Sequence, residues 1–477
     1  MILLRYLIVV TFIFMLPAYL AAQVPGTLWT KTLGGSLGEQ GYDIQQTSDG
    51  GFIVAGHTFS FGAGNGDAWL VRLNSNGDTL WAYTYGTGGG SYESANSVYQ
   101  TSDGGFIFAG SIYPGSPNNA YFVKTDANGV AEWTQTIGGF DTDNASSVLQ
   151  TNDGGYIICG DTRSFHNGFG SSVWLIRTNS IGDTLWTKVY GGSSYQGGKS
   201  IKQTTDDGFI VTGSYNNGGA TSTEVWLLKT DANGDTLWTK TFGGDGTQEG
   251  YNVLQTDDGG YLIAGSQSWA EIWLIRTNSA GDTLWTKTYP GAIGGGNCLS
   301  HASDGGFIIT GSDFNGDLLV VRTDENGDLL WSSTYDRGIS DAGRAVIQVA
   351  GGGYIVCGST DSTGTGNTDI WLIRLDSDGT TSINEEPALV NQFQLNQNYP
   401  NPFNPSTKIS WQSPVGSWQV LKVFDVLGNE VVTLVNEFKP AGNYEVEFDA
   451  SGLSSGVYYY RLISENLIST KKLTLIK

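Results

Sequence analysis

One pattern recurs seven times in this chain: a glycine-rich turn is followed by an aromatic residue and a short apolar run, as in "SDGGFIVAG" and "DDGGYLIAG". The repeats lie 46 to 54 residues apart, measured between the aromatic residues Phe52, Phe106, Tyr156, Phe209, Tyr261, Phe307 and Tyr354. Periods near fifty residues are typical of β-propellers and solenoids. Each repeat contains four strand-like pieces, which in the first repeat are "YDIQQT", "GFIVAG", "AWLVRL" and "TLWAYTY". Seven units of four strands predict an all-β fold, a seven-bladed β-propeller.

A tryptophan marks the fourth strand of each predicted blade, at Trp29, Trp81, Trp133, Trp186, Trp238, Trp285 and Trp331. The first of them, in "GTLWT", lies ahead of the first repeat, whereas the last repeat ends in "LDSDGTTSINEE" without a tryptophan. We therefore expect the N-terminal strand to complete the seventh blade, because a closed ring leaves no unpaired strand edge. On this interpretation the propeller covers residues 23–375.

The tryptophan-bearing strand, as in "TDANGDTLWT", resembles the tryptophan-docking repeat of quinoprotein-type propellers over ten residues of each repeat. That resemblance implies tryptophans that lock neighbouring blades together. Quinoprotein dehydrogenases also carry adjacent cysteines, but Cys159, Cys298 and Cys357 are far apart in this sequence. The resemblance thus concerns packing, and we expect no cofactor. The "DANGD" turns lack the D-x-D-x-D-G order of an EF-hand, so we expect no metal site either.

Two polar positions are shared by the repeats. A basic residue ends the third strand of every predicted blade, and we expect it to pair with carboxylates of the next turn, such as Asp78 or Asp235; an anion-binding ring is the alternative. The basic set is Arg72, Lys124, Arg177, Lys229, Arg276, Arg322 and Arg374. A glutamine ends the first strand in six repeats, and His301 replaces it in the sixth, which predicts a structural hydrogen-bonding role for His301.

Variable loops are expected on one face of the propeller. Strands of a meander alternate in direction, so the short uniform turns share one face and the variable loops share the opposite face. Binding residues are usually placed on variable loops of a rigid scaffold. Aromatic rings beside charged and amide groups suit stacking on sugars or contact with a protein partner. The candidate ligand-binding residues on this loop face are His57, Phe59, Tyr113, Arg163, Phe165, His166, Tyr195, Tyr215, Trp269 and Phe314.

Composition narrows the function classes. The formal net charge is −22, which argues against a nucleic-acid partner because a phosphate backbone requires Lys and Arg. Three histidines in the whole chain argue against a histidine-based metal site or catalytic triad. A carbohydrate-active hydrolase or lyase stays open, because Asp141, Asp143, Arg163 and Tyr195 offer carboxylates, an arginine and a tyrosine. A structural or adhesive surface protein is the remaining alternative.

The N-terminal residues 1–22, "MILLRYLIVVTFIFMLPAYLAA", predict a secretory signal peptide. Arg5 supplies the positive charge, an apolar run follows, and Ala21 and Ala22 offer a cleavage site before Gln23. A membrane anchor is the alternative, but Pro17 interrupts the run. We therefore expect an exported mature chain without a transmembrane segment.

The composition changes after the predicted linker at residues 376–392. Residues 393–477 contain "NYPNPFNPST", "VFDVLGNEV" and "SGLSSGVYYYRL" and end in a lysine-bearing strand, "TKKLTLIK". Alternating strands and turn residues predict a small Ig-like β-sandwich. The same motifs closely resemble the C-terminal sorting domain of proteins exported by the type IX secretion system of Gram-negative bacteria. The resemblance implies recognition by that machinery and passage through the outer membrane, to the cell surface or the medium.

Overall fold

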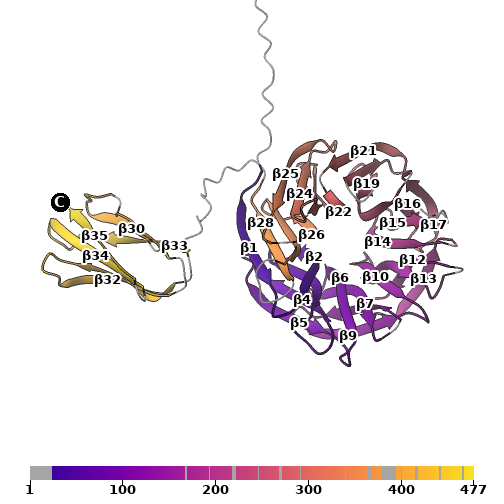
Figure 1. Cartoon of the computed structure of the whole chain (residues 1–477), viewed down its shortest axis with the longest axis horizontal. Coiled ribbons are helices and arrows are strands. Elements are labelled where there is room, and N and C mark those ends of the chain that lie inside the picture. The colour runs from indigo at the N-terminus through magenta and orange to yellow at the C-terminus, as the bar shows by residue number, and fades with distance from the viewer. Residues whose placement is uncertain are drawn as a thin grey trace, which may run out of the picture. The chain divides into compact units, whose positions relative to one another are not determined.

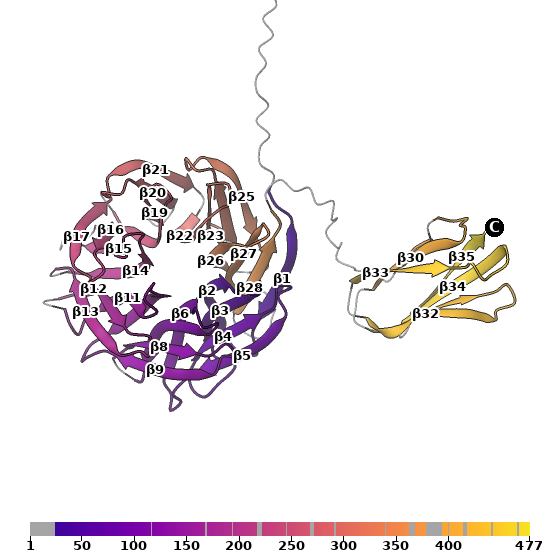
Figure 2. The same ribbon diagram turned by 180° about the vertical axis from the view of Figure 1, so that it is seen from behind.

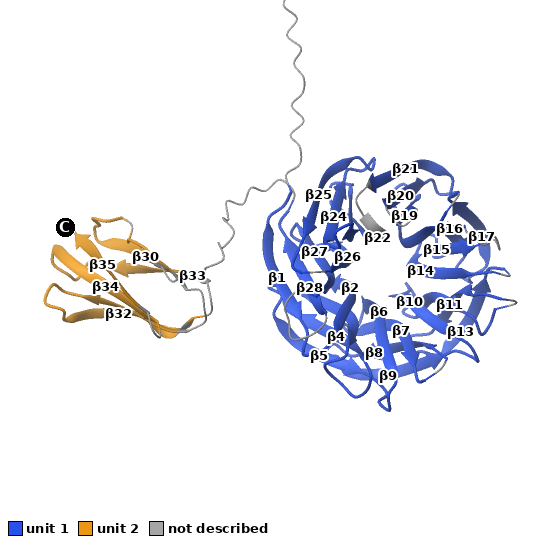
Figure 3. Ribbon diagram, in the orientation of Figure 1, with its two compact units in different colours: residues 1–380 blue, residues 381–477 orange. Residues whose placement is uncertain are grey.

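The computed structural model describes residues 24–377 and 394–477, apart from residues 116, 167–168, 193, 217–221, 245, 268–270, 291, 339, 362–367, 399, 414–416, 440–441 and 465–466. The predicted signal peptide and most of the predicted linker lie outside the described residues. The chain divides into two compact units, residues 1–380 and 381–477, which Figure 3 colours separately. All secondary-structure elements within the described residues are β-strands.

The described part of the first unit forms seven four-stranded sheets. The first three sheets are β2 (Glu39–Gln46), β3 (Phe52–Thr58), β4 (Asp67–Leu73) and β5 (Thr79–Tyr85); β6 (Tyr92–Gln100), β7 (Phe106–Tyr113), β8 (Asn119–Thr125) and β9 (Ala131–Ile137); and β10 (Asp143–Gln150), β11 (Tyr156–Thr162), β12 (Ser172–Thr178) and β13 (Thr184–Tyr190). The next three are β14 (Gln196–Gln203), β15 (Phe209–Asn216), β16 (Thr223–Thr230) and β17 (Thr236–Phe242); β18 (Gln248–Gln255), β19 (Tyr261–Gln267), β20 (Glu271–Thr277) and β21 (Thr283–Pro290); and β22 (Ala292–His301), β23 (Phe307–Asp313), β24 (Leu318–Thr323) and β25 (Leu329–Tyr335). The seventh sheet contains β26 (Asp341–Gln348), β27 (Tyr354–Thr360), β28 (Asp369–Leu375) and β1 (Thr27–Leu33).

The sheets follow one another around a common axis, an arrangement consistent with a β-propeller (Figures 1 and 2). The second and third strands of a sheet are covered on both faces, and every residue of β3 and β4 is buried. The fourth strands alternate between exposed and half-buried residues, as in β13. This difference explains why the second and third strands read as continuous apolar runs, whereas the fourth strand carries Thr and Lys.

The seventh sheet is completed from the N-terminal side of the unit. Strand β1 is antiparallel to β28, with Thr27 opposite Leu375 and Leu33 opposite Ile370. The backbone N–H of Asp376 also donates to the carbonyl oxygen of Gly26 at 2.9 Å. The edge of β28 is therefore hydrogen-bonded along its length.

Tryptophans of the fourth strands join each sheet to the next one. Trp29 of β1 lies over the turn glycine Gly77 of the first sheet, where a Cβ atom would approach the indole to 2.8 Å. The centroids of the Trp29 and Phe52 rings are 6.4 Å apart, and those of Trp81 and Phe106 are 5.8 Å apart. A glycine is needed at Gly77 because the indole occupies the space of a side chain and because φ is +79°.

The shared glutamines form hydrogen bonds between sheets. The Oε1 atom of Gln100 accepts from the backbone N–H of Ser48 at 2.8 Å, and that of Gln46 accepts from Ala350 N–H at 2.7 Å. Thus the last sheet is bonded to the first as the first is to the second. His301, which replaces glutamine, places Nε2 3.2 Å from the carbonyl oxygen of Gln255 in the preceding sheet.

The shared basic residues pair with carboxylates, but the expected partners were wrong. Arg72 binds Asp49 at 2.6 Å, whereas Asp78 binds Lys31 of β1 at 3.0 Å. The correct partner is the aspartate of the glycine-rich turn in the same sheet, because the third strand ends beside that turn. Hydrogen bonds from Arg276, then from Thr256 and a backbone N–H, lower the pKa of Asp258 to about 2. The seventh sheet lacks this aspartate, and Arg374 donates to the carbonyl oxygen of Gly352 instead.

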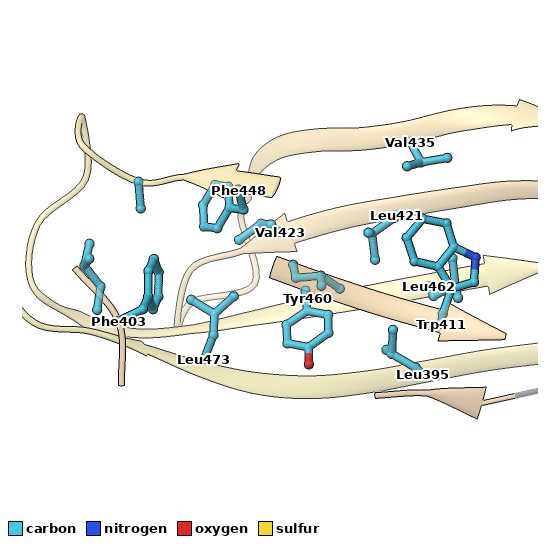
Figure 4. Close-up of a cluster of buried hydrophobic side chains, with 13 residues drawn as sticks. Leu395, Phe403, Trp411, Leu421, Val423, Val435, Phe448, Tyr460, Leu462 and Leu473 are labelled. Carbon is cyan, nitrogen blue, oxygen red and sulfur yellow. The ribbon is translucent and has the colours of Figure 1, made fainter. Parts of the chain in front are cut away.

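The second unit contains two sheets around a shared core. One sheet is formed by β29 (Gln394–Leu395), β30 (Ser406–Ser413) and β33 (Gly442–Asp449), and the other by β32 (Glu430–Lys439), β31 (Ser417–Phe424), β34 (Gly456–Ser464) and β35 (Leu467–Leu475). Trp411 from the first sheet packs in one cluster with Leu421, Tyr460 and Leu473 from the second (Figure 4). Trp411 Nε1 donates to the side-chain oxygen of Gln419 at 2.6 Å, whereas the buried Nε2 of Gln419 has no hydrogen-bond partner among the described residues.

Trp29→Ala should lower the free energy of unfolding of the full chain by about 2 kcal/mol, because it uncovers Phe52 and removes a half-buried indole. Leu28→Ala on the same strand is the matched control, since Leu28 is exposed and should change the stability little. Urea unfolding followed by tryptophan fluorescence measures both. Equal effects of the two substitutions would contradict the proposed role of Trp29.

Candidate functional site

The loops on the predicted binding face are held by buried polar side chains at the start of six of the seven first strands. Asp143 is the clearest case: Oδ2 accepts from Gly139 N–H at 2.8 Å and from Ser164 Oγ at 2.6 Å, and Oδ1 accepts from Thr162 Oγ1 at 2.5 Å. These bonds tie the loop that enters the sheet to the loop that follows β11. The same position holds Glu39, Glu93, Gln196, Gln248 and Asp341 in other sheets. Both loops are thereby fixed to the scaffold.

Four of the predicted binding residues come together on loops of the third sheet. The Arg163 guanidinium lies 5.8 Å from the centroid of the Tyr195 ring, a cation–π geometry. Phe165 packs at 5.3 Å against the buried Trp174, and half of its surface stays exposed. His166 Nδ1 is 2.6 Å from Ser172 Oγ. The sequence analysis listed all four among the loop residues, and the structure adds these contacts; their role in binding stays a prediction.

Two more aromatic residues belong to this neighbourhood. Phe169 follows in the same loop as Phe165 and is 92% exposed, and Phe140 is completely exposed beside Gly139. Gly139 adjoins the Phe165 ring, since a Cβ atom on it would lie 3.7 Å from that ring. Phe140 was absent from the predicted site, although an aromatic residue after Gly138 and Gly139 was a visible signal. We define the loop patch as Phe140, Arg163, Phe165, Phe169 and Tyr195.

His57 and Phe59 form a separate cluster on the first sheet. His57 belongs to β3 and is only 4% exposed. Its ring centroid lies 5.1 Å from that of Phe59, 5.3 Å from Tyr92 and 5.5 Å from Tyr42. Phe59 keeps an exposed face. His57 is thus a buried residue that packs against three aromatic rings, and Phe59 is the residue of the pair that is exposed to solvent.

The remaining predicted residues lie on other sheets. Tyr113 is exposed at the end of β7, opposite Tyr92 in the strand pairing. Tyr215 packs at 5.4 Å against Trp226. Phe314 is exposed in the turn after β23. Trp269 lies outside the described residues.

A cavity of about 610 Å³ is lined by the first strands of all seven sheets. Six of these strands contain a bulge at one equivalent position, and β22 has a longer irregularity that ends at the matching residue. The residues at this position all line the cavity: Tyr42, Asn96, Ser146, Lys199, Tyr251, Asn297 and Arg344. None of them was among the predicted site residues. The available signal was the small residue that precedes each one, for example Gly41 or Ala95.

Three carboxylates on the sixth and seventh sheets could share a cation. Oxygens of Asp317, Asp336 and Asp341 all lie within 4.8 Å of one another. Desolvation, and then the charges of Asp313, Asp336 and Asp341, raise the pKa of Asp317. Carboxylate oxygens of this kind are the ligands that Ca²⁺ prefers.

Residues 397–477 match the family model of the secretion system C-terminal sorting domain. The C-terminal part of the chain therefore belongs to this family, as its motifs predicted. The domain indicates export across the outer membrane by the type IX system, so the protein is secreted or displayed on the cell surface.

No helix in the described part of the chain is long and apolar enough to cross a membrane. No curated protein matches the chain.

Solved structures resemble this chain at low identity. PorZ, a surface component of the type IX secretion system of Porphyromonas gingivalis, is 12% identical with a TM-score of 0.44, over 91% of this chain and 59% of PorZ. A puromycin hydrolase is 13% identical with a TM-score of 0.48, over 79% and 59%. A fungal alcohol oxidase, in complex with copper, is 11% identical with a TM-score of 0.45, over 95% and 100%. The chain spans about three fifths of the PorZ and puromycin hydrolase chains.

Burial lowers the pKa of His57 to about 4, against the opposing charge of Glu39, whereas an unfolded histidine titrates near 6.5. The unfolded chain therefore binds more protons between these values, and the contribution of His57 to stability is complete above about pH 6.5 and declines toward about pH 4. NMR titration of the imidazole signals should show His57, assigned by His57→Phe, still neutral at about pH 5. A titration midpoint at the ordinary value would contradict its burial.

Proposed function

We propose that this chain is an exported binding protein, in which a closed seven-bladed β-propeller is delivered by the sorting domain and binds glycans through its loop patch. Closure is supported by the Gln46–Ala350 hydrogen bond between the first and last sheets. It is also supported by a shared core, in which Ile44 and Phe52 pack in one cluster with Ile370 and Leu372. The second unit serves as an Ig-like sandwich that the type IX machinery recognises.

The observation that carries this function is the exposed aromatic surface of the loop patch. Soluble proteins rarely leave large apolar rings clustered and uncovered unless the surface binds something. Phe140 and Phe169 are almost fully exposed, yet the neighbouring loops are fixed by Asp143 and its hydrogen bonds. Flat aromatic rings suit the apolar faces of sugar rings.

Arg163 gives the loop patch a polar component. Its guanidinium stacks toward Tyr195, which leaves N–H groups free to bind hydroxyl or carboxylate oxygens of a sugar. Aromatic rings with a few directed polar groups are the usual composition of a small-ligand site. The arrangement therefore supports a glycan in preference to a purely apolar ligand.

Binding is favoured over hydrolysis by the role of Asp143. A glycosidase needs two carboxyl groups that face the scissile bond. Asp143 is completely buried, and both of its oxygens accept hydrogen bonds from loop groups. Asp141 beside it is exposed, and the third nearby carboxylate, Asp161, accepts a hydrogen bond from Asn144 Nδ2 at 3.2 Å. The pair considered for catalysis thus contains one structural residue.

Tyr195→Ala should weaken glycan binding by the full chain about fivefold, because it removes a stacking surface and the partner of Arg163, worth roughly 1 kcal/mol. A glycan array identifies the ligand, and titration of that ligand gives the dissociation constants.

The matched control is Tyr83→Ala on β5, which removes another exposed tyrosine, outside the variable loops, and should leave binding unchanged. A blank array, or equal losses with both substitutions, would reject glycan binding by the loop patch. Release of shortened glycan from the array would instead establish hydrolysis.

A further inference from the structure

The cavity on the axis of the sheets is basic in an otherwise acidic protein. It is lined by Lys199, Lys202 and Arg344, against a formal charge of −22 for the chain. Among the described residues, none of these three side chains has a carboxylate within ion-pair distance. Elsewhere in the unit basic side chains are commonly paired, as Lys188 is with Asp235 at 2.5 Å. The three cations of the cavity therefore differ from these paired residues in having no direct ion pair.

The scaffold does not require these cations. Lys199 and Arg344 occupy the bulge position of β14 and β26, where other sheets carry Tyr42 or Asn96. Asn96 bonds the next sheet, with Nδ2 donating to the carbonyl oxygen of Ala145 at 2.9 Å. Lys199 and Arg344 make no such bond and are exposed to the cavity. A position that tolerates such different side chains is free to serve a ligand.

Asp43 does not neutralise the cavity. It is the one carboxylate among the described residues that line it, and its oxygens accept the backbone N–H groups of Ile44 and Val98, each at 2.9 Å. Lys202 acts on Asp43 through its charge, although they lie on the fourth and first sheets. A smaller adjoining pocket shares Arg344 and is bordered by Asp313 and Asp341. The charge of Lys199 likewise acts on Asp161 of the third sheet, without a direct ion pair between them in the described part of the chain.

We propose that this cavity binds a small carboxylate-bearing ligand, with Arg344, Lys199 and Lys202 as the anion-binding groups. Cations on the fourth and seventh sheets reach the ligand from two sides, and the guanidinium of Arg344 can bind a carboxylate with two hydrogen bonds. Tyr42 and Tyr251 supply ring surface and hydroxyl groups nearby. The volume matches that of typical small-molecule sites. This site is separate from the loop patch and does not depend on its proposed function.

Calorimetric titration of the full chain tests the site with galacturonate, N-acetylneuraminate and citrate, and with neutral galactose as the uncharged comparison. At least one carboxylate should bind, and its affinity should fall with added salt because the cations are solvated. Arg344→Gln and Lys199→Gln should each weaken binding about tenfold, since each removes a charge-assisted hydrogen bond. Lys240→Gln is the matched control, because Lys240 is paired with Asp282 on an outer strand.

Three results would overturn the proposal. One is the failure of all three carboxylates to bind; another is equally tight binding of galactose. The third is unchanged affinity in both cavity variants, each checked for native thermal unfolding. Tyr195→Ala separates the two sites: loss of carboxylate binding in that variant would move the anion to the loop patch. Retained binding there, with loss in Lys199→Gln, would support the cavity even if no glycan binds the loop patch.

Discussion

The hydrogen bonding of β1 to β28 is the contact on which the first unit depends. It gives the seventh sheet its fourth strand, and with that strand comes Trp29, which covers Gly77 and Phe52 of the first sheet. The last sheet is thereby joined to the first by the same indole contact that joins Trp81 to Phe106. Without β1 the strand β28 would present an open edge, and the core shared by the first and last sheets would be uncovered.

The repeated four-stranded architecture could be predicted from the sequence because the same residue types recur at equivalent positions of each repeat. The aromatic residue after the glycine-rich turn, the tryptophan of the fourth strand and the terminal glutamine each do the same structural work in successive sheets. The position of Trp29 ahead of the first repeat was also informative, because the last repeat lacks a tryptophan-bearing fourth strand. The sorting domain was legible for another reason: its motifs are distinctive, and the family match at residues 397–477 agrees with them.

The candidate sites were harder to predict because they depend on register and on neighbours distant in sequence. His57 was assigned to a loop, but the strand continues through it and aromatic rings cover it. The ion-pair partner predicted for Arg72 was wrong, because the sequence does not show which turn lies beside the end of the third strand. The cavity residues differ at one equivalent position, so a comparison that looks for shared residues passes over Lys199 and Arg344. In this repeat unit the shared positions therefore identify the scaffold, whereas the proposed cavity site depends on positions that differ between sheets.

The origin of β1 also has a consequence for the order of folding. Its partner β28 is the last strand of the unit along the chain, so β1 has no partner until the rest of the unit has been synthesised. An unpaired strand promotes aggregation, because its free backbone N–H and C=O groups can pair with another chain. The composition of β1 limits that hazard, since Thr30 and Thr32 face outward and Lys31 places a charge in the strand. Contacts between distant segments form slowly, so we expect the pairing of β1 with β28 to be a late step in the folding of this unit.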